Sequence, residues 1–240
     1  MIQRKITTFV LSTQHHIHNM KLLISAITKY LMGITLMGTL IFFPAGTLHW
    51  SNAWLLMAIL FIPMFLMGIV MYVKSPELLT KRLNNKEKRS TQKNVVALSG
   101  LIFIGGFVIA GLNYRFGWHT LPNYISYIFA TIFIIGYALY AEVMRENTYL
   151  SRTIEIQENQ TVVSTGLYGI VRHPMYMATI LMYLSIPLIL GSILSLAIFL
   201  LYLPIIARRI NDEEQLLKSE LPGYTEYCQK VRWRLIPFIY

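Results

Sequence analysis

The sequence is poor in charged residues, in acidic residues and in cysteine, and these shortages limit the class of protein. Only 13% of its 240 residues are charged whereas 55% are hydrophobic, a composition that is unusual for a soluble domain. The single cysteine, Cys228, cannot form an internal disulfide, so the chain is not a disulfide-stapled domain. Only 11 acidic residues oppose 21 Lys and Arg. We therefore expect a membrane protein with an excess of positive charge.

The sequence also lacks the patterns of a metal site and of a cleavable signal peptide. His15, His16 and His18 cluster in a polar leader without a Cys or carboxylate partner, so we expect no metal ligation. The apolar stretch at 9–11 is too short for a signal peptide, and no small-residue cleavage site follows it. We expect neither a resident metal nor a processed leader.

Six apolar stretches recur along the chain and predict helices that cross a membrane. Four of them are long enough to span a hydrocarbon core of about 30 Å at about 1.5 Å per residue, and the last two are slightly short. Gly191 and Ser192 leave room only for a turn between the last two, which predicts a tight antiparallel hairpin bent at Pro187. The predicted fold is an all-α integral membrane protein with about six transmembrane helices. The expected spans are residues 30–46, 53–73, 95–112, 124–144, 175–190 and 193–207.

The distribution of cations predicts the orientation in the membrane. Of the 21 Lys and Arg, 19 lie in segments that fall on one side if six spans alternate; Arg115 and Lys29 are the exceptions. Cytoplasmic segments collect Lys and Arg, so both termini should be cytoplasmic in a multi-pass inner or cell membrane. The net charge of +10 is then a topology signal, and we expect no nucleic-acid partner.

The stretch TGLYGIVRHPMYMATI, residues 165–180, places polar groups at the edge of an apolar run. Pro174 needs no N–H at a helix start, which predicts a helix that begins there with His173 at its cap. The unpaired N–H groups and positive dipole end would lie beside Arg172 and form an anion site. Tyr168 and Tyr176 can add hydroxyls. Alternatively, Arg172 snorkels and Tyr176 belongs to an interfacial aromatic belt.

A second polar cluster, RRINDEEQLL at 208–217, continues from the sixth span and should return to the same face as His173. Arg209 and Glu213 are one helical turn apart, so they form either a simple ion pair or part of a site. Glu213 and Glu214 near an anion-binding helix start would suit a zwitterionic or cationic cofactor.

The segment between the fourth span and the motif, NTYLSRTIEIQENQTVVSTG, contains two alternating runs around residues 158–160. This pattern predicts a small cytoplasmic hairpin. The hairpin could cover the site as a lid or serve only as a connector.

The ordered pattern Thr165-Gly166-x-Tyr168-x-x-x-Arg172-His173-Pro174-x-Tyr176 is followed about 40 residues later by Glu213-Glu214 and then by Tyr224-x-x-Tyr227. Over roughly residues 145–240 this pattern resembles the isoprenylcysteine carboxyl methyltransferase family and its phospholipid methyltransferase relatives. The resemblance implies a membrane methyltransferase that binds S-adenosylmethionine at the cytoplasmic end of a helical hairpin and admits a lipidic substrate from the bilayer. Residues 1–144 would then be a leader with four spans, and residues 145–240 the catalytic region.

The resemblance also implies roles for individual residues. Arg209 falls where the family has a substrate-facing Arg, and with Arg172 it forms the expected catalytic pair. Gln157 matches a cofactor-binding Gln, although its spacing is shorter here. The expected cofactor-binding residues are Gln157, Gln160, Thr161, Val162, Val163, Tyr168, His173, Pro174, Met175, Tyr176, Glu213 and Glu214.

The chemistry depends on the acceptor. S-adenosylmethionine carries a good leaving group, so methyl transfer to an ionised carboxylate needs alignment and exclusion of water but no general base. An amine acceptor must be neutral to attack, and His173 or Glu214 would then be candidate bases.

Two alternatives remain open. The tail from Tyr227 to Tyr240 also resembles the ending of the membrane sterol reductases, which use a nicotinamide cofactor. A non-enzymatic membrane scaffold would leave the clustered polar residues unexplained.

Overall fold

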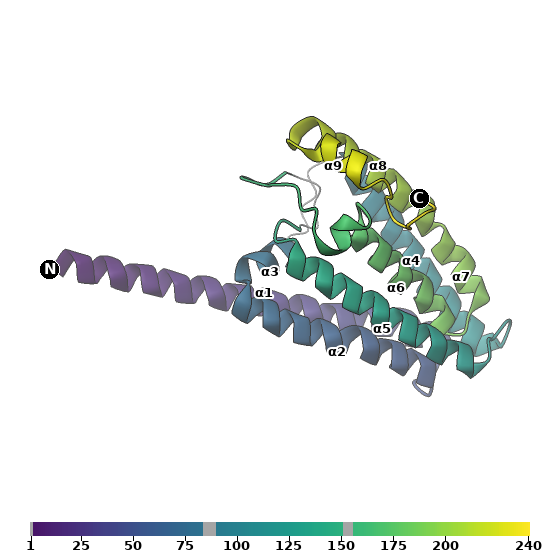
Figure 1. The fold of residues 1–240 in the computed structure, drawn as a ribbon. Coiled ribbons are helices and arrows are strands. Elements are labelled where there is room, and N and C mark those ends of the chain that lie inside the picture. Colours follow the sequence, from purple (N-terminus) through teal and green to yellow (C-terminus); the bar gives the residue numbers. More distant parts are fainter. Residues whose placement is uncertain (1, 84–89, 151–155) are drawn as a thin grey trace.

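Helices account for all the regular secondary structure in the part of the chain that the structure, a computed structural model, describes (Figure 1). The backbone is described for residues 2–83, 90–150 and 156–240, and the side chains for residues 20–83, 93–150 and 156–240. The predicted all-α fold class is confirmed. The helical segments are α1 (Ile2–Ala45), α2 (Ser51–Lys74), α3 (Pro76–Leu83), α4 (Ser90–Phe116), α5 (Asn123–Glu146), the 3-10 helix η1 (Gly166–Gly169), α6 (Pro174–Ile189), α7 (Ile193–Leu200), α8 (Tyr202–Glu220) and α9 (Tyr224–Lys230).

Five stretches of these helices are long and apolar enough to cross a membrane. They are Met20–Ala45, Ser51–Lys74, Lys93–Phe116, Asn123–Glu146 and Ile193–Glu220. Helix α6 is apolar but has only 16 residues, somewhat fewer than the roughly 20 needed to span a bilayer. An integral membrane protein is therefore supported, and both the count of six spans and their orientation remain predictions.

A sharp turn connects α6 to α7, and these two helices pack against each other. Gly191 adopts φ +72°, a left-handed conformation that favours glycine, and the Ser192 hydroxyl caps α7 by accepting from Ser195 N at 3.2 Å. Helix α8 follows α7 after a break at Leu201. Pro204 lacks the N–H that would bond to the carbonyl of Leu200, which explains the break.

One apolar core joins the N-terminal and C-terminal parts of the bundle. Its buried residues come from α1, α2, α4, α5, α6 and α7 and include Ile41, Leu56, Phe133 and Phe199. Gly106 of α4 permits the close approach of α7, because a Cβ there would lie 2.3 Å from the Phe199 ring. Residues on both sides of position 144 share this core. The predicted division into a scaffold (1–144) and a catalytic region (145–240) is therefore not a division into separate cores and remains a prediction about function.

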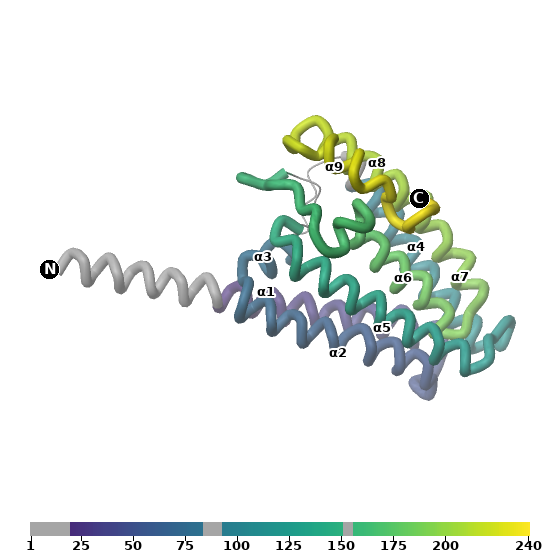
Figure 2. Tube along the Cα trace, in the orientation of Figure 1, coloured from purple at the N-terminus to yellow at the C-terminus, as the bar shows by residue number. Residues whose placement is uncertain are grey.

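The C-terminal tail docks on the start of α6 and completes the polar end of the bundle. Arg172 N donates to Trp233 O, and His173 N donates to Arg234 O, each at 2.9 Å. Figure 2 shows the yellow tail beside the green segment that precedes α6. Residues 156–164, the described part of the predicted hairpin, form no strand; residues 151–155 lie outside the described residues.

Candidate functional site

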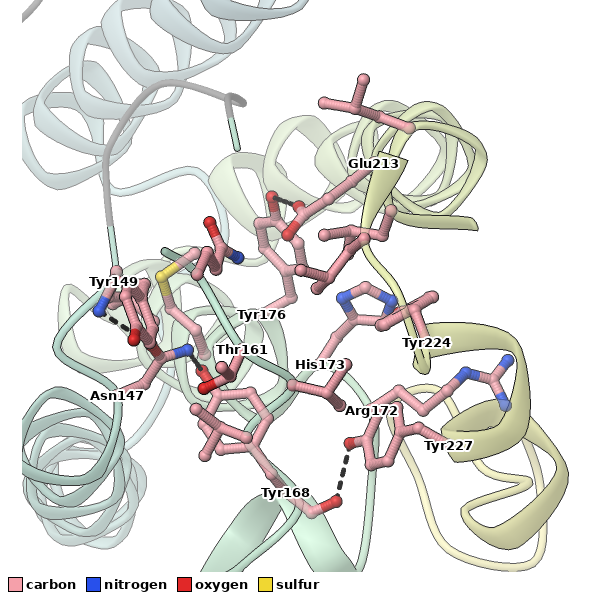
Figure 3. Close-up of a pocket in the computed structure, with 18 of the residues that line it drawn as sticks. Asn147, Tyr149, Thr161, Tyr168, Arg172, His173, Tyr176, Glu213, Tyr224 and Tyr227 are labelled. Carbon is pink, nitrogen blue, oxygen red and sulfur yellow. Dashed lines mark hydrogen bonds between the residues drawn. The ribbon is translucent and has the colours of Figure 1, made fainter. Parts of the chain in front are cut away.

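A cavity lies where the end of α5, the segment before η1, the start of α6, and helices α8 and α9 converge (Figure 3). It contains about 890 Å³ of space free of protein atoms, including a part open to solvent. Its lining residues are Asn147, Tyr149, Leu150, Gln160, Thr161, Val162, Val163, Tyr168, Arg172, His173, Met175, Tyr176, Arg209, Glu213, Leu216, Leu217, Leu221, Tyr224 and Tyr227.

The helix start predicted from Pro174 is present. Pro174 is the first residue of α6, and His173 is its cap with non-helical backbone, although the His173 side chain makes no capping hydrogen bond. The buried His173 ring instead faces Glu214, whose Oε1 lies 3.1 Å from His173 Nε2. The imidazole is thus fixed by α8 at the edge of the cavity.

Glu146 at the end of α5 holds the turn that precedes the motif. Its carboxylate accepts from Thr165 Oγ1 at 2.7 Å and from Leu167 N at 3.3 Å. Gly166 sits against this carboxylate with φ +50°, and a Cβ there would lie 2.3 Å from a carboxylate oxygen. Position 166 therefore requires glycine for both its conformation and its close contact.

Glu214 is a buried carboxylate that lies beside several positively charged side chains next to the cavity. It is only 2% exposed, and its Oε1 accepts from Arg172 Nε at 2.7 Å. Its Oε2 lies 3.0 Å from Arg234 and 3.8 Å from Lys218, ion pairs that lack hydrogen-bond geometry. Cations surround the buried carboxylate on several sides, as a buried charge requires. Glu214 thus joins α8, the motif and the tail.

Arg172 is committed to protein atoms. Its Nη1 donates to the carbonyls of Val231 at 2.9 Å and Arg232 at 2.7 Å, in addition to the Nε contact with Glu214. The sequence analysis assigned the positive charge of Arg172 to an anionic ligand. In the structure the guanidinium instead links the motif, α8 and the tail, at the wall of the cavity.

Tyr176 connects the two residues that the sequence placed on one face of α8. Its hydroxyl donates to Glu213 Oε2 and accepts from Arg209 Nε at 3.0 Å. Tyr176 is 5% exposed, and Figure 3 shows its hydroxyl meeting Glu213 at one side of the cavity. A shared buried hydroxyl therefore fixes the positions of a cation and a carboxylate that both line the cavity.

Tyr168 is held from two directions. Its hydroxyl accepts from Asn147 Nδ2 at 2.9 Å, and its carbonyl accepts from the Tyr227 hydroxyl at 2.7 Å. Burial raises the pKa of the Tyr168 hydroxyl above its usual value of 10.0, an effect that outweighs the opposing hydrogen bond from Asn147. Tyr168 therefore remains protonated at neutral pH.

Internal hydrogen bonds shape the segment that precedes η1. Gln157 Nε2 donates to Tyr149 O at 2.6 Å, and Gln157 N donates to Gln160 Oε1 at 2.9 Å. The side chain of Gln157 is thus used to fold the segment, while residues 160–163 face the cavity.

The structure brings most of the predicted site residues together. Arg172, Arg209, Gln160, Thr161, Val162, Val163, Tyr168, His173, Met175, Tyr176 and Glu213 line the cavity. Gln157, Pro174 and Glu214 are not among its described lining residues, but Gln157 and Glu214 contact residues that are. Their roles in binding remain predictions.

The sequence analysis did not assign several lining residues. They are Asn147, Tyr149, Leu150, Leu216, Leu217, Leu221, Tyr224 and Tyr227. Leu217 and Leu221 follow Glu213 at intervals of one helical turn, but leucines in an apolar chain do not stand out as site residues. Nothing in the local pattern of Asn147 or Tyr149 indicated a site.

The described residues hold no group of three His, Cys, Asp or Glu that could bind a metal ion. The leader cluster at residues 15, 16 and 18 lies outside the described side chains.

Comparison with known proteins finds the family that the motif resembles. Residues 129–219 match the model of the isoprenylcysteine carboxyl methyltransferase (ICMT) family. The chain is also 32% identical over 91 residues to "Delta(14)-sterol reductase TM7SF2" of Mus musculus, which covers 37% of this chain and 22% of that protein. The solved "Structure of the eukaryotic intramembrane Ras methyltransferase ICMT (isoprenylcysteine carboxyl methyltransferase) without a monobody" is 20% identical, with a TM-score of 0.46 over 90% of this chain and 86% of that one.

The fold defines a multi-helix membrane protein with a cavity lined by polar and apolar residues at one end of its bundle. The predicted resemblance to the isoprenylcysteine carboxyl methyltransferase family is confirmed over residues 129–219. This segment contains most of the cavity lining and ends just before Leu221, Tyr224 and Tyr227. The match with the sterol reductase spans about a fifth of that protein's length.

Proposed function

We propose that the protein is a membrane methyltransferase that transfers the methyl group of S-adenosylmethionine to a lipidic carboxylate, such as that of a prenylated cysteine or a related small lipid. One observation carries the proposal. Within the family-matched segment, Tyr176 holds Arg209 and Glu213 together at the wall of the cavity. The cation suits an acidic acceptor, and the carboxylate suits a cofactor with ammonium and hydroxyl groups.

The residues present fit such a cofactor. The cavity combines apolar walls from Leu217 and Leu221 with the polar groups of His173 and Glu213, as a purine joined to a zwitterionic amino acid requires. The buried hydroxyl of Tyr224 also lines the cavity and has no hydrogen-bond partner among the described residues. A buried hydroxyl without a partner is rare in folded proteins and fits a site that a ligand completes.

The cofactor would be held by Glu213, His173 and the backbone of residues 160–163. When bound, it supplies a methyl group on a sulfonium, which is an electrophile with a good leaving group. The protein then has to align the acceptor and exclude water. Arg209, fixed through the Tyr176 hydroxyl, would hold the acceptor carboxylate in a forked pair of hydrogen bonds.

A carboxylate acceptor is also favoured by the charged state of Glu214, one of the two candidate bases. Glu214 is surrounded by Arg172, His173 and Arg234, so its carboxylate is stabilised in the charged form and is a poor proton acceptor. His173 Nε2 faces the same carboxylate. An amine acceptor would need one of these groups as a base, whereas an ionised carboxylate needs neither.

The remaining expectations belong to the same proposal. The polar end of the bundle would face the cytoplasm with both termini, and the acceptor would enter from the bilayer. Residues 1–144 would provide the membrane scaffold and residues 145–240 the catalytic region.

A second candidate is a nicotinamide-dependent membrane reductase. It is favoured by the 32% identity to the sterol reductase over 91 residues and by the C-terminal sequence.

Titration of the detergent-solubilised protein separates the two candidates. We expect S-adenosylmethionine and its demethylated product to bind and to raise the thermal midpoint, while reduced nicotinamide dinucleotides do not. Binding of the nicotinamide cofactor alone would favour the reductase and contradict the methyltransferase.

A further inference from the structure

Tyr224, the first residue of α9, carries a buried polar group that the proposed mechanism does not yet use. The residue is 4% exposed and lines the cavity, and its hydroxyl has no hydrogen-bond partner among the described residues. The thiol of Cys228, one turn further along α9, lies beside the hydroxyl and is its one weak contact, because a thiol is a poor hydrogen-bond partner and the pair lacks full hydrogen-bond geometry among the described residues.

The other buried tyrosines around the cavity are satisfied by the protein. The hydroxyl of Tyr227 donates to Tyr168 O, that of Tyr168 accepts from Asn147, and that of Tyr176 contacts Glu213. Because buried hydroxyls in native proteins nearly always have partners, the missing partner of Tyr224 should come from whatever fills the cavity.

The surroundings of Tyr224 select the kind of partner. Val162, Leu217 and Leu221 pack in the same apolar cluster and also line the cavity, so this side of the cavity has apolar walls. In Figure 3, Tyr224 lies on the yellow α9 side, opposite Asn147 and Tyr149. Such walls suit a planar aromatic ring far better than a charged amino-acid group.

The charges near Tyr224 also limit which kind of group its hydroxyl can bind. Burial raises the pKa of its hydroxyl well above 10.0, and the negative charges of Glu214 and Glu213 raise it further. The hydroxyl therefore keeps its proton and can donate it in a hydrogen bond. The same two carboxylates disfavour an anion at this position, which leaves a neutral acceptor.

We propose that Tyr224 recognises the purine base of the cofactor by donating a hydrogen bond to one of its ring nitrogens, with Val162, Leu217 and Leu221 packing around the ring. This inference rests on the proposed function and adds to it the residue that reads the base. It extends the site beyond residues 129–219, the segment that the family match covers.

Tyr224→Phe tests the inference, with Tyr227→Phe as the matched control in the same helix. Loss of the Tyr224 hydroxyl should weaken binding of S-adenosylhomocysteine in calorimetry by about 3- to 10-fold, the usual effect of one neutral hydrogen bond. The thermal midpoint of the cofactor-free variant should be unchanged or higher, because a buried hydroxyl without a partner has been removed. Tyr227→Phe should instead lower that midpoint, because Tyr168 O loses its donor.

Analogues of S-adenosylhomocysteine that lack N1, N3 or N7 of the base identify the acceptor. One of them should bind wild-type protein more weakly by about the same factor, and Tyr224→Phe should not weaken that analogue any further. The inference is overturned if no analogue binds more weakly to wild-type protein, a result that does not depend on the variants folding. It is also overturned if every analogue loses affinity independently of Tyr224→Phe, or if Tyr224→Phe destabilises the cofactor-free protein as Tyr227→Phe does.

Failure of the proposed function looks different. If S-adenosylhomocysteine and S-adenosylmethionine do not bind wild-type protein at all, the methyltransferase assignment falls and this inference falls with it. If they bind wild-type protein and Tyr224→Phe equally well, only the role of Tyr224 is wrong.

Discussion

Removal of the Tyr176 hydroxyl perturbs the geometry at the centre of the proposed site. This hydroxyl donates to Glu213 and accepts from Arg209 at 3.0 Å, so Tyr176→Phe frees both side chains while the ring keeps its packing among Tyr202, Ile206 and Ile210. A hydrogen bond to a charged group contributes about 1.5–3 kcal/mol. The two bonds are coupled through one hydroxyl, so we take this range once for the transition state. It corresponds to a fall in kcat/KM of about 10- to 150-fold.

The assay is methyl transfer from labelled S-adenosylmethionine to a prenylcysteine analogue, with the cofactor Kd measured separately. We expect KM for the acceptor to rise and the cofactor to bind more weakly, because Arg209 and Glu213 lose a common anchor. Tyr30→Phe is the matched control, since its hydroxyl also bonds inside the protein, to Phe61 O at 3.1 Å, but lies in α1 away from the cavity. Wild-type kcat/KM in folded Tyr176→Phe protein would refute the positioning role.

Three further predictions address the division of roles, the turn and the topology. Arg209→Lys should lower kcat/KM for the acceptor by about tenfold or more with nearly unchanged cofactor Kd, because Lys cannot form the forked contact. Glu213→Gln should instead raise the cofactor Kd first. Equal loss of cofactor binding in both variants would show that the two residues are one structural ion pair. Gly166→Ala should lower the free energy of unfolding by about 1–3 kcal/mol through strain at φ +50°, measured by thermal unfolding, and a wild-type midpoint would show that the turn adapts. In a Cys228→Ser background, labelling of Arg82→Cys by a membrane-impermeant thiol reagent should occur from the cytoplasmic side, and labelling from outside would overturn the orientation.

The sequence allowed prediction of features that depend on local pattern. Hydropathy indicated the membrane helices, and the ring of Pro174 fixed the start of α6 with His173 at its cap. The turn at Gly191 was likewise visible, because only a tight reversal fits two residues between two apolar runs. These features depend on a few neighbouring residues each.

Contacts between distant segments could not be predicted in the same way. The tail docks on the motif through backbone hydrogen bonds from Arg172 to Trp233 and from His173 to Arg234, which leave no side-chain signature. The burial of Glu214 among cations from several elements also has no periodic signal.

Only part of the site could be predicted, because only some of its residues stand out in the local sequence. The polar residues of the motif and of α8 were found because an apolar background makes them conspicuous. The apolar wall at Leu217 and Leu221 was missed, because leucines in a membrane protein carry no such contrast.

The measurement that tests the central claim most directly is transfer of labelled methyl from S-adenosylmethionine to defined lipids by the purified protein. Prenylcysteine with a free carboxyl group, its methyl ester, an amine-headed phospholipid and a sterol would be offered in parallel under the same conditions. The account predicts base-labile label on the free prenylcysteine and none on its ester. Label confined to the amine lipid would contradict the carboxylate acceptor, and absence of label on every lipid, together with reduction of the sterol by a nicotinamide cofactor, would contradict the methyltransferase itself.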